Sequence, residues 1–262
     1  MKNNIYKKTH ILFSPTNENP FLAIWKEKNL PSCALSKDDT NSATNFALKH
    51  FPELSKIKCK NENDFGLIHR LDNRASGILL FALSQESYDS LLQFQKDEKI
   101  IKTYSAVCYN LEENANLLKG YPPFMNMREL LLLQKSITAK SFFRSYEKGS
   151  RAVRPVTNEQ SQIILKKSGK VLYKTNILLE NTMQKNKVQN DENLFFQVKC
   201  KIANGFRHQV RCHLSWLGFP IVGDDLYNAH YNSEALCFEC VEINFPHPVT
   251  KCPVTIKVPR SE

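Results

Sequence analysis

The chain has 262 residues, with 36 Lys and Arg against 26 Asp and Glu, so its formal net charge is +10. This length allows one large domain or two small ones, and it excludes a small disulfide-stapled scaffold despite the eight cysteines. No apolar run approaches the roughly 20 residues of a membrane-spanning helix, and the polar first residues predict no secretory signal. We therefore expect a protein of the reducing cytoplasm, with a basic surface suited to phosphate backbones.

The first third of the chain predicts short strands and one helix. Apolar runs indicate strands near Ile11–Phe13 and Phe21–Trp25, and a helix is expected near Ala43–His50. Two further short strands are predicted at Leu67–Arg70 and Ile78–Leu83.

The loop between the last two strands contains an aspartate among cations. Asp72 follows His69 and Arg70 and precedes Arg74, and Gly77 is expected to permit a tight return of the chain. Nearby positive charge favours the ionised form of a carboxylate. Such a group can act as a nucleophile or a base while its neighbours bind a polyanion.

A helix and a long strand follow. Ser84 is a plausible N-cap for a helix whose apolar residues have helical spacing, and Ile100–Cys108 has a β-rich composition. The period of two places four residues on one face of this strand: Lys102, Tyr104, Ala106 and Cys108.

Residues 110–174 form a basic segment in which secondary structure is poorly predicted. Prolines interrupt it, and Glu129–Gln134 fits either a short helix or a strand. Between Lys119 and Lys174 there are twelve basic and three acidic residues, which is nearly the whole charge excess. So concentrated a charge favours a contact surface over a compositional bias.

The part of this segment from Lys140 to Arg154 also contains aromatic residues. Phe142, Phe143 and Tyr146 alternate with cations, a pattern that suits stacking on RNA bases and binding of phosphates. A buried edge strand with solvated lysines explains the same pattern almost equally well.

The rest of the chain predicts mainly strands. These lie at Val171–Glu180, Leu194–Ile202, Leu236–Ile243 and Val254–Val258, and the polar linker Asn181–Asn193 reads as an exposed hairpin loop. Strands outnumber helices and no βα alternation is sustained, so we predict an α+β fold with a mixed, mainly antiparallel sheet flanked by helices.

A helix is predicted between these strands, from Arg207 to Leu217, and Gly218 is placed to end it. The spacing of Arg207, His208 and Arg211 projects them together on one side, where they could orient Asp72 and neutralise a phosphate. An ordinary amphipathic helix with a solvated polar face is the alternative interpretation.

Together these segments closely resemble the RluA-type RNA pseudouridine synthases. The resemblance runs from about Leu12 to Val258, although Ala75 and Phe206 replace the usual Thr and Arg, and the usual Lys-Pro pair is absent near Trp25–Leu30. The matching motifs, in order, are His69-Arg70-Leu71-Asp72 with Ser76-Gly77, Lys102-x-Tyr104, Arg207-His208-Gln209-Val210-Arg211-x-His213-Leu214, Gly218-x-Pro220-Ile221-x-Gly223-Asp224-x-x-Tyr227, and Phe245-Pro246-His247-Pro248.

The resemblance implies a single catalytic domain over residues 1–262, with a central active-site cleft and no N-terminal S4 module. It implies that Asp72 is the catalytic aspartate, that Tyr104 packs on the target uracil and that Arg211 pairs with the carboxylate. The implied RNA-binding residues are His69, Arg70, Lys102, Arg207 and His208.

The implied reaction converts a specific uridine in ribosomal or transfer RNA to pseudouridine after the base leaves its stack. The N1–C1′ bond breaks, the uracil turns, and C5 bonds to C1′. Asp72 would act either as a nucleophile or as the base that removes the C2′ proton. The reaction requires no cofactor and no metal, and we expect a monomer that does not bind membranes.

The same residues are also compatible with other functions. An RNA chaperone or assembly factor would use the same scaffold without turnover, and a hydrolase would use Asp72 to release uracil. Cys237 and Cys240 form a single pair, where a structural zinc site usually has two, so we interpret them as ordinary thiols. An acid–base pair of His69 and His208 is less favoured, because the isomerisation does not demand an imidazole.

Overall fold

The computed structural model of the protein describes residues 8–34, 39–109, 120–123, 128–145, 149–184, 194–228 and 235–259. The chain forms two compact units, which we describe separately. Unit 1 comprises residues 1–103 and 239–262, and unit 2 comprises residues 104–238.

The described helices and strands alternate irregularly along the chain. Unit 1 contains β1 (His10–Phe13), β2 (Phe21–Lys26), α1 (Ala43–His50), the 3-10 helices η1 (Pro52–Lys56) and η2 (Glu62–Asp64), β3 (Ser76–Ala82), α2 (Gln85–Lys96), the start of β4 (Ile101–Tyr109), nearly all of β9 (Phe238–Pro246) and β10 (Pro253–Lys257). Unit 2 contains the rest of β4, α3 (Arg128–Gln134), β5 (Ser136–Ser145), β6 (Val153–Val156), α4 (Gln162–Lys166), β7 (Tyr173–Gln184), β8 (Leu194–Ile202) and α5 (Gln209–Trp216).

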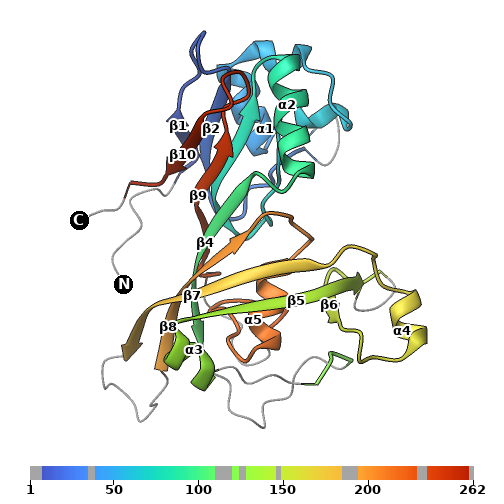
Figure 1. The fold of residues 1–262 in the computed structure, drawn as a ribbon. Coiled ribbons are helices and arrows are strands. Elements are labelled where there is room, and N and C mark those ends of the chain that lie inside the picture. Colours follow the sequence, from blue (N-terminus) through green and yellow to red (C-terminus); the bar gives the residue numbers. More distant parts are fainter. Residues whose placement is uncertain are drawn as a thin grey trace. The chain divides into compact units, whose positions relative to one another are not determined.

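The sheet of unit 1 is built around β3. Its described strands follow the order β1, β2, β3, β9, with β10 also paired to β9. The β3–β9 pairing is parallel, and the other described pairings of this unit are antiparallel. Every residue of β3 is buried, as expected for an unbroken apolar run at the centre of a sheet, and α2 packs against it (Figure 1).

Gly77 does not make the tight return that the sequence suggested. It lies inside β3, opposite Cys240 of β9, with a φ of 134°. A Cβ at this position would come within 2.4 Å of the Cys240 backbone nitrogen. The glycine therefore permits the close approach of two backbones, and the turn containing Asp72 lies before it.

In unit 2 the described strands follow the order β4, β8, β7, β5, β6, and antiparallel pairings join β8 to β7, β7 to β5 and β5 to β6. The helix α5 packs against β6 and β7 (Figure 1). A buried cluster between these elements consists of Phe143, Ala152, Val153, Cys212 and Tyr227.

The α+β class and the mixed, mainly antiparallel sheet are confirmed. The helix predicted at Ala43–His50 and the strand predicted at Leu194–Ile202 have the expected bounds. Ser84 is the N-cap of α2, and its hydroxyl accepts a hydrogen bond from the Ser87 amide at 3.1 Å. The four residues expected on one face of β4 are all buried.

Two predicted segments were wrong. Leu67–Arg70 is not a strand, although Leu67 forms an isolated bridge to Phe81. The linker predicted at Asn181–Asn193 begins too early, because β7 continues to Gln184 in its pairing with β8, and residues 185–193 lie outside the described residues.

The basic segment at 110–174 contains more structure than its sequence predicted. Glu129–Gln134 belongs to the helix α3, which settles the choice between helix and strand. The strands β5 and β6 and the helix α4 were not predicted. Tyr146, one of the expected stacking residues, lies outside the described residues.

Candidate active site

The Asp72 loop of unit 1 is attached to the interior by a buried lysine. Lys26, the last residue of β2, has no exposed surface, and its ammonium lies within hydrogen-bond distance of four carbonyls, two that follow β2 and two that follow Asp72. Burial lowers the pKa of Lys26 to about 8, against the opposing effect of the Asp72 carboxylate. The accepting carbonyls and their distances from Nζ are Glu27 at 2.9 Å, Leu30 at 2.8 Å, Asn73 at 3.2 Å and Ala75 at 2.6 Å.

A serine holds the residue before Asp72. The Ser32 hydroxyl donates to the Leu71 carbonyl at 2.9 Å and accepts from the Leu71 amide at 3.0 Å. The Ala75 amide donates to the Asp72 carbonyl at 3.1 Å and closes the turn. The backbone is thus fixed immediately before and after the half-buried Asp72.

Arg70 lies at the surface of unit 1. Its side chain is 51% exposed, and its guanidinium bonds the Asp64 carboxylate at 2.7 Å. The bond to Asp64 outweighs partial burial and raises the pKa of Arg70, so the group is a permanent cation. This geometry is compatible with contact to a polyanion.

His69 and Lys102, which were expected to bind RNA, are buried inside unit 1. Their exposed fractions are 6% and 3%. Burial, together with the nearby Lys102 cation, lowers the pKa of His69 to about 3, so this imidazole is neutral at physiological pH. Burial also lowers the pKa of Lys102, while Cys240 has the opposite effect. The assignment of both residues to RNA stays a prediction, and their burial favours a role inside the unit.

Tyr104 begins the unit 2 part of β4 and is 6% exposed. Its ring stacks on Phe238, with 4.9 Å between centroids and 11° between planes. The stacking partner fixes the plane of the tyrosine ring, which suits a flat platform for a base.

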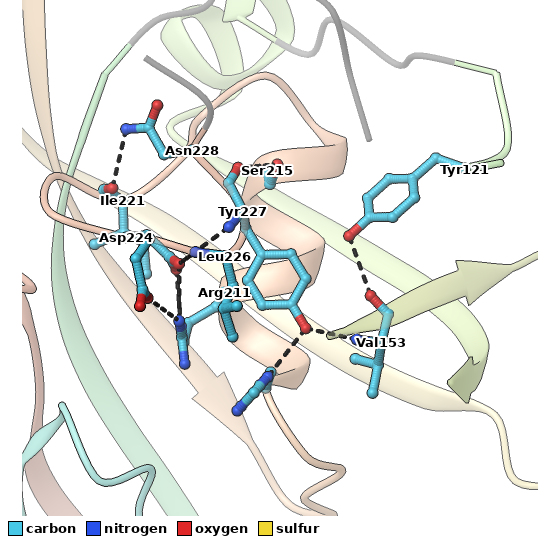
Figure 2. A network of polar contacts seen from close by, with 11 residues as sticks. Tyr121, Val153, Arg211, Ser215, Ile221, Asp224, Leu226, Tyr227 and Asn228 are labelled. Carbon is cyan, nitrogen blue, oxygen red and sulfur yellow. Dashed lines mark hydrogen bonds and ion pairs between the residues drawn. The ribbon is translucent and has the colours of Figure 1, made fainter. Parts of the chain in front are cut away.

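Arg211 of α5 is held by a buried carboxylate, as Figure 2 shows. Its Nε and one terminal nitrogen each lie 2.8 Å from an oxygen of Asp224, and the two side chains are 3% and 0% exposed. Oδ1 of Asp224 also accepts the amides of Leu226 and Tyr227 at 3.0 and 3.1 Å. These bonds orient the aspartate, and the two-point contact orients the guanidinium.

Tyr227 connects this ion pair to the rest of unit 2 (Figure 2). The Arg211 guanidinium lies 5.4 Å from the centre of its ring. The Tyr227 hydroxyl accepts the Val153 amide at 2.8 Å and lies 3.1 Å from Nδ1 of His208. Burial raises the pKa of Tyr227, so the hydroxyl is neutral.

The predicted cationic face of the helix is not present. The helix begins at Gln209, after Arg207 and His208, and His208 has a left-handed φ of 56°. Arg207 is exposed and donates to the Ser150 carbonyl at 3.2 Å, whereas Arg211 is buried. The helix ends at Trp216, one residue before the predicted end, and Gly218 follows with a left-handed φ of 88°, as expected of a residue that ends a helix.

Sequence reasoning missed the groups that hold the two predicted catalytic side chains. Lys26 ends a strand that is otherwise apolar, which is an unusual place for a lysine and could have identified it. Asp224 was visible in the Gly223-Asp224 motif but received no role. Ser32 gave no distinguishing signal.

The pairing of Asp72 with Arg211 stays a prediction, because the two residues belong to different units. All eight cysteines are free thiols. Within the described ranges, no group of three or more His, Cys, Asp or Glu side chains could hold a metal ion. None of the described helices is long and apolar enough to cross a membrane.

The family model of RNA pseudouridylate synthases matches residues 5–216, which include Asp72, Tyr104 and Arg211. The chain therefore belongs to the RNA pseudouridylate synthase family, and the predicted enzyme class, an RNA pseudouridine synthase, is confirmed.

Curated relatives carry related names. The tRNA pseudouridine synthase C of Vibrio cholerae is 27% identical over 202 residues, which cover 72% of this chain and 70% of that protein. The ribosomal large subunit pseudouridine synthase C of Rickettsia felis is 31% identical over 164 residues, covering 63% of this chain and 42% of that protein. The matched region thus spans less than half of the second relative.

A solved structure has a similar fold. Human RNA pseudouridylate synthase domain containing 1 superposes with a TM-score of 0.65 at 16% identity, covering 99% of this chain and 86% of that one.

Proposed function

We propose that this protein isomerises specific uridines of ribosomal or transfer RNA to pseudouridine, with Asp72 as the catalytic carboxylate. The observation that carries the proposal is the attachment of the Asp72 loop on both sides. Ser32 bonds the backbone of Leu71 at 2.9 and 3.0 Å, and Lys26 bonds the carbonyls of Asn73 and Ala75 at 3.2 and 2.6 Å. A reacting group held this firmly gains rate, because its position need not be found during the reaction.

Each step then has an assigned group. The uridine leaves its stack, and Tyr104 supports the uracil with a ring already fixed by Phe238. Asp72 attacks as a nucleophile or removes the C2′ proton, and either route needs an ionised carboxylate. Arg211, oriented by Asp224, is the proposed cation of the site.

For RNA contact we propose Arg70 and Arg207, which are both exposed. His208 is half-buried against Tyr227 and supports the residue before it. His69 and Lys102 act from inside unit 1, where they support the strand and loop that present Asp72. The function needs no cofactor, and a monomer acting in the cytoplasm suffices for it.

The names of the relatives support both substrate classes, because one names tRNA and the other the ribosomal large subunit. The test is a transcriptome map of pseudouridine in ribosomal and transfer RNA after deletion of the gene. We expect the loss of one or a few sites, restored by the wild-type gene and not by Asp72→Asn.

Purified protein provides the second half of the test. Wild type should convert the mapped uridine in an unmodified transcript, while Asp72→Asn should be at least about a thousandfold slower and bind the transcript normally. Release of free uracil would identify a hydrolase, and an unchanged map with normal binding would leave an RNA-binding protein. Either outcome contradicts the proposal.

A further inference from the structure

The sheet of unit 2 has one face turned toward α5 and one turned away from it. Ser141 of β5 and Thr175 of β7 each lie 2.8 Å from a ring nitrogen of His213 in α5, so these positions face the helix. Side chains alternate along a strand, so the preceding positions, Lys140 and Lys174, lie on the opposite face. Both lysines are exposed.

Like charges are paired directly across this outer face. Lys140 of β5 is opposite Lys174 of β7, and Arg144 of β5 is opposite Arg154 of β6. Burial and the Arg154 cation lower the pKa of Arg144. Like charges directly opposite one another destabilise a sheet. A bound anion would offset the repulsion within both pairs.

The positive charge continues onto the neighbouring strand. Lys199 and Lys201 of β8 pair with Leu178 and Asn176 of β7, on the same face. Glu180 is the one acid among the outward positions that the structure describes on these four strands, and it forms an ion pair with Lys199. We define the basic sheet face by its six cations: Lys140, Arg144, Arg154, Lys174, Lys199 and Lys201.

An aromatic side chain lies between the two like-charge pairs. Phe142 has the same parity on β5 as Lys140 and Arg144, and it is half-buried. Its neighbour Phe143, which the sequence also suggested for stacking, is 1% exposed and stacks on Phe206 in the core of unit 2 at 4.9 Å. Phe142 alone of these two can therefore meet a base.

We propose that the basic sheet face is an RNA-binding surface, which takes the phosphate backbone of the substrate in addition to the contacts made near Asp72. Rows of cations on adjacent strands, about 5 Å apart, suit a chain of regularly spaced phosphates. This inference rests on the proposed function for the identity of the polyanion as RNA. Figure 1 shows β5 and β7 side by side, the two strands that contribute Lys140 and Lys174.

The test replaces four cations by neutral side chains of similar length, in the full chain: Lys140→Gln, Arg144→Gln, Arg154→Gln and Lys174→Gln. Binding to an unmodified tRNA transcript is measured by fluorescence anisotropy from 50 to 300 mM KCl. We expect at least about tenfold weaker binding at 100 mM, and a salt slope shallower by about 3, because each phosphate contact contributes roughly 0.7 to 0.9. The melting temperature should not fall, since the substitutions remove repulsion.

A matched control removes four exposed lysines of unit 1 and so makes the same change in net charge: Lys49→Gln, Lys56→Gln, Lys58→Gln and Lys96→Gln. We expect this control to retain the wild-type slope. A sheet-face variant with the wild-type slope, or equal losses in both variants, would overturn the proposal. So would a variant that loses binding to poly-glutamate but binds the transcript normally, since that outcome assigns the face to an acidic protein.

RNA binding by the basic sheet face can be tested independently of the proposed catalytic function. Asp72→Asn should bind the transcript with the wild-type salt slope while forming no pseudouridine. If wild type also forms none, the proposed function fails, and the comparison of slopes still decides whether this face binds RNA.

Discussion

The two proposed catalytic charges are held by opposite kinds of support. In unit 1, a buried cation binds backbone carbonyls around Asp72, so Lys26 fixes the path of the loop. In unit 2, a buried carboxylate binds the functional cation Arg211 directly. The first arrangement positions a residue through its backbone and leaves its side chain for chemistry, whereas the second makes the functional side chain part of the core. Changes to the first should therefore affect rate, and changes to the second should affect stability.

The largest effect expected from this comparison is on stability, in Asp224→Asn. The substitution removes the buried, two-point counter-ion of the Arg211 guanidinium, a loss that typically costs about 3–5 kcal/mol. Urea unfolding should show this loss in the free energy of unfolding. Asp225→Asn is the control, because Asp225 is exposed and lies 3.6 Å from Arg211, and it should cost at most about 1 kcal/mol. Equal losses in the two variants would contradict the assignment.

Lys26→Met should mainly affect rate. Its lowered pKa means that the fold keeps this ammonium charged at a cost, and methionine removes both that cost and the bonds to the loop. We expect the free energy of unfolding to change by less than about 2 kcal/mol, while kcat falls about 10- to 100-fold as Asp72 loses its position. A stability loss with an unchanged kcat in the remaining folded protein would show that the loop needs no anchor.

The same lysine gives a pH prediction. Between pH 8 and 10.5 the unfolded chain binds more protons at Lys26 than the native chain does. The contribution of Lys26 to the free energy of unfolding therefore rises with pH. The attachment of the Asp72 loop weakens over the same pH range. Deprotonation leaves the Lys26 amine with two N–H donors in place of three for the four carbonyls. The rate should therefore fall above about pH 8 without a loss of stability, and Lys26→Met should lack this alkaline limb.

The core of unit 2 should also make the protein sensitive to acid. His213 lies between the hydroxyls of Ser141 and Thr175, and burial lowers its pKa to about 3. Between pH 6.5 and 3 the unfolded chain binds the extra proton, so stability is lost as the pH falls. From pH 7 to 5 this one group should remove about 2 kcal/mol from the free energy of unfolding. Between pH 7 and pH 5, His213→Gln should lose about 2 kcal/mol less of its free energy of unfolding than wild type loses. His50→Gln is the control at an exposed position, and it should show the wild-type loss.

The smallest effect is expected from Ser32→Ala. It removes the hydroxyl that both donates to and accepts from the Leu71 backbone, which should cost about 1–2 kcal/mol of stability and a few-fold in kcat. Stopped-flow or single-turnover measurement of pseudouridine formation would detect the change in rate. A larger rate loss than that of Lys26→Met would mean that the residue before Asp72 matters more than those after it.

The sequence predicted local structure where one signal dominated. The apolar run of β3, the cap of α2 and the alternation of β4 all gave the observed elements, because each depends on neighbouring residues. Motif resemblance gave the family and the candidate residues Asp72, Tyr104 and Arg211. It could not give Asp224 as the partner of Arg211, because that contact depends on how a loop returns to α5.

Other features depended on tertiary contacts and were not predictable. The alternation of β5 has small residues such as Ser141 and Ala139 on its buried face, so its hydrophobic signal is weak. The inward position of Phe143 depends on the ring of Phe206, more than sixty residues later along the chain. Likewise, the burial of His69 and Lys102 could not be inferred from residue types that are usually exposed.

The parallel pairing of β3 with β9 affects the order of events on the ribosome. Ser76 and Glu239, which pair in this register and bond through their side chains, are 163 residues apart. At a synthesis rate of about 5–20 residues per second, roughly 8 to 30 s pass between the synthesis of β3 and that of β9. During that interval one edge of β3, whose residues are all buried in the folded protein, has no β9 beside it. A chaperone would therefore help most in this period of synthesis.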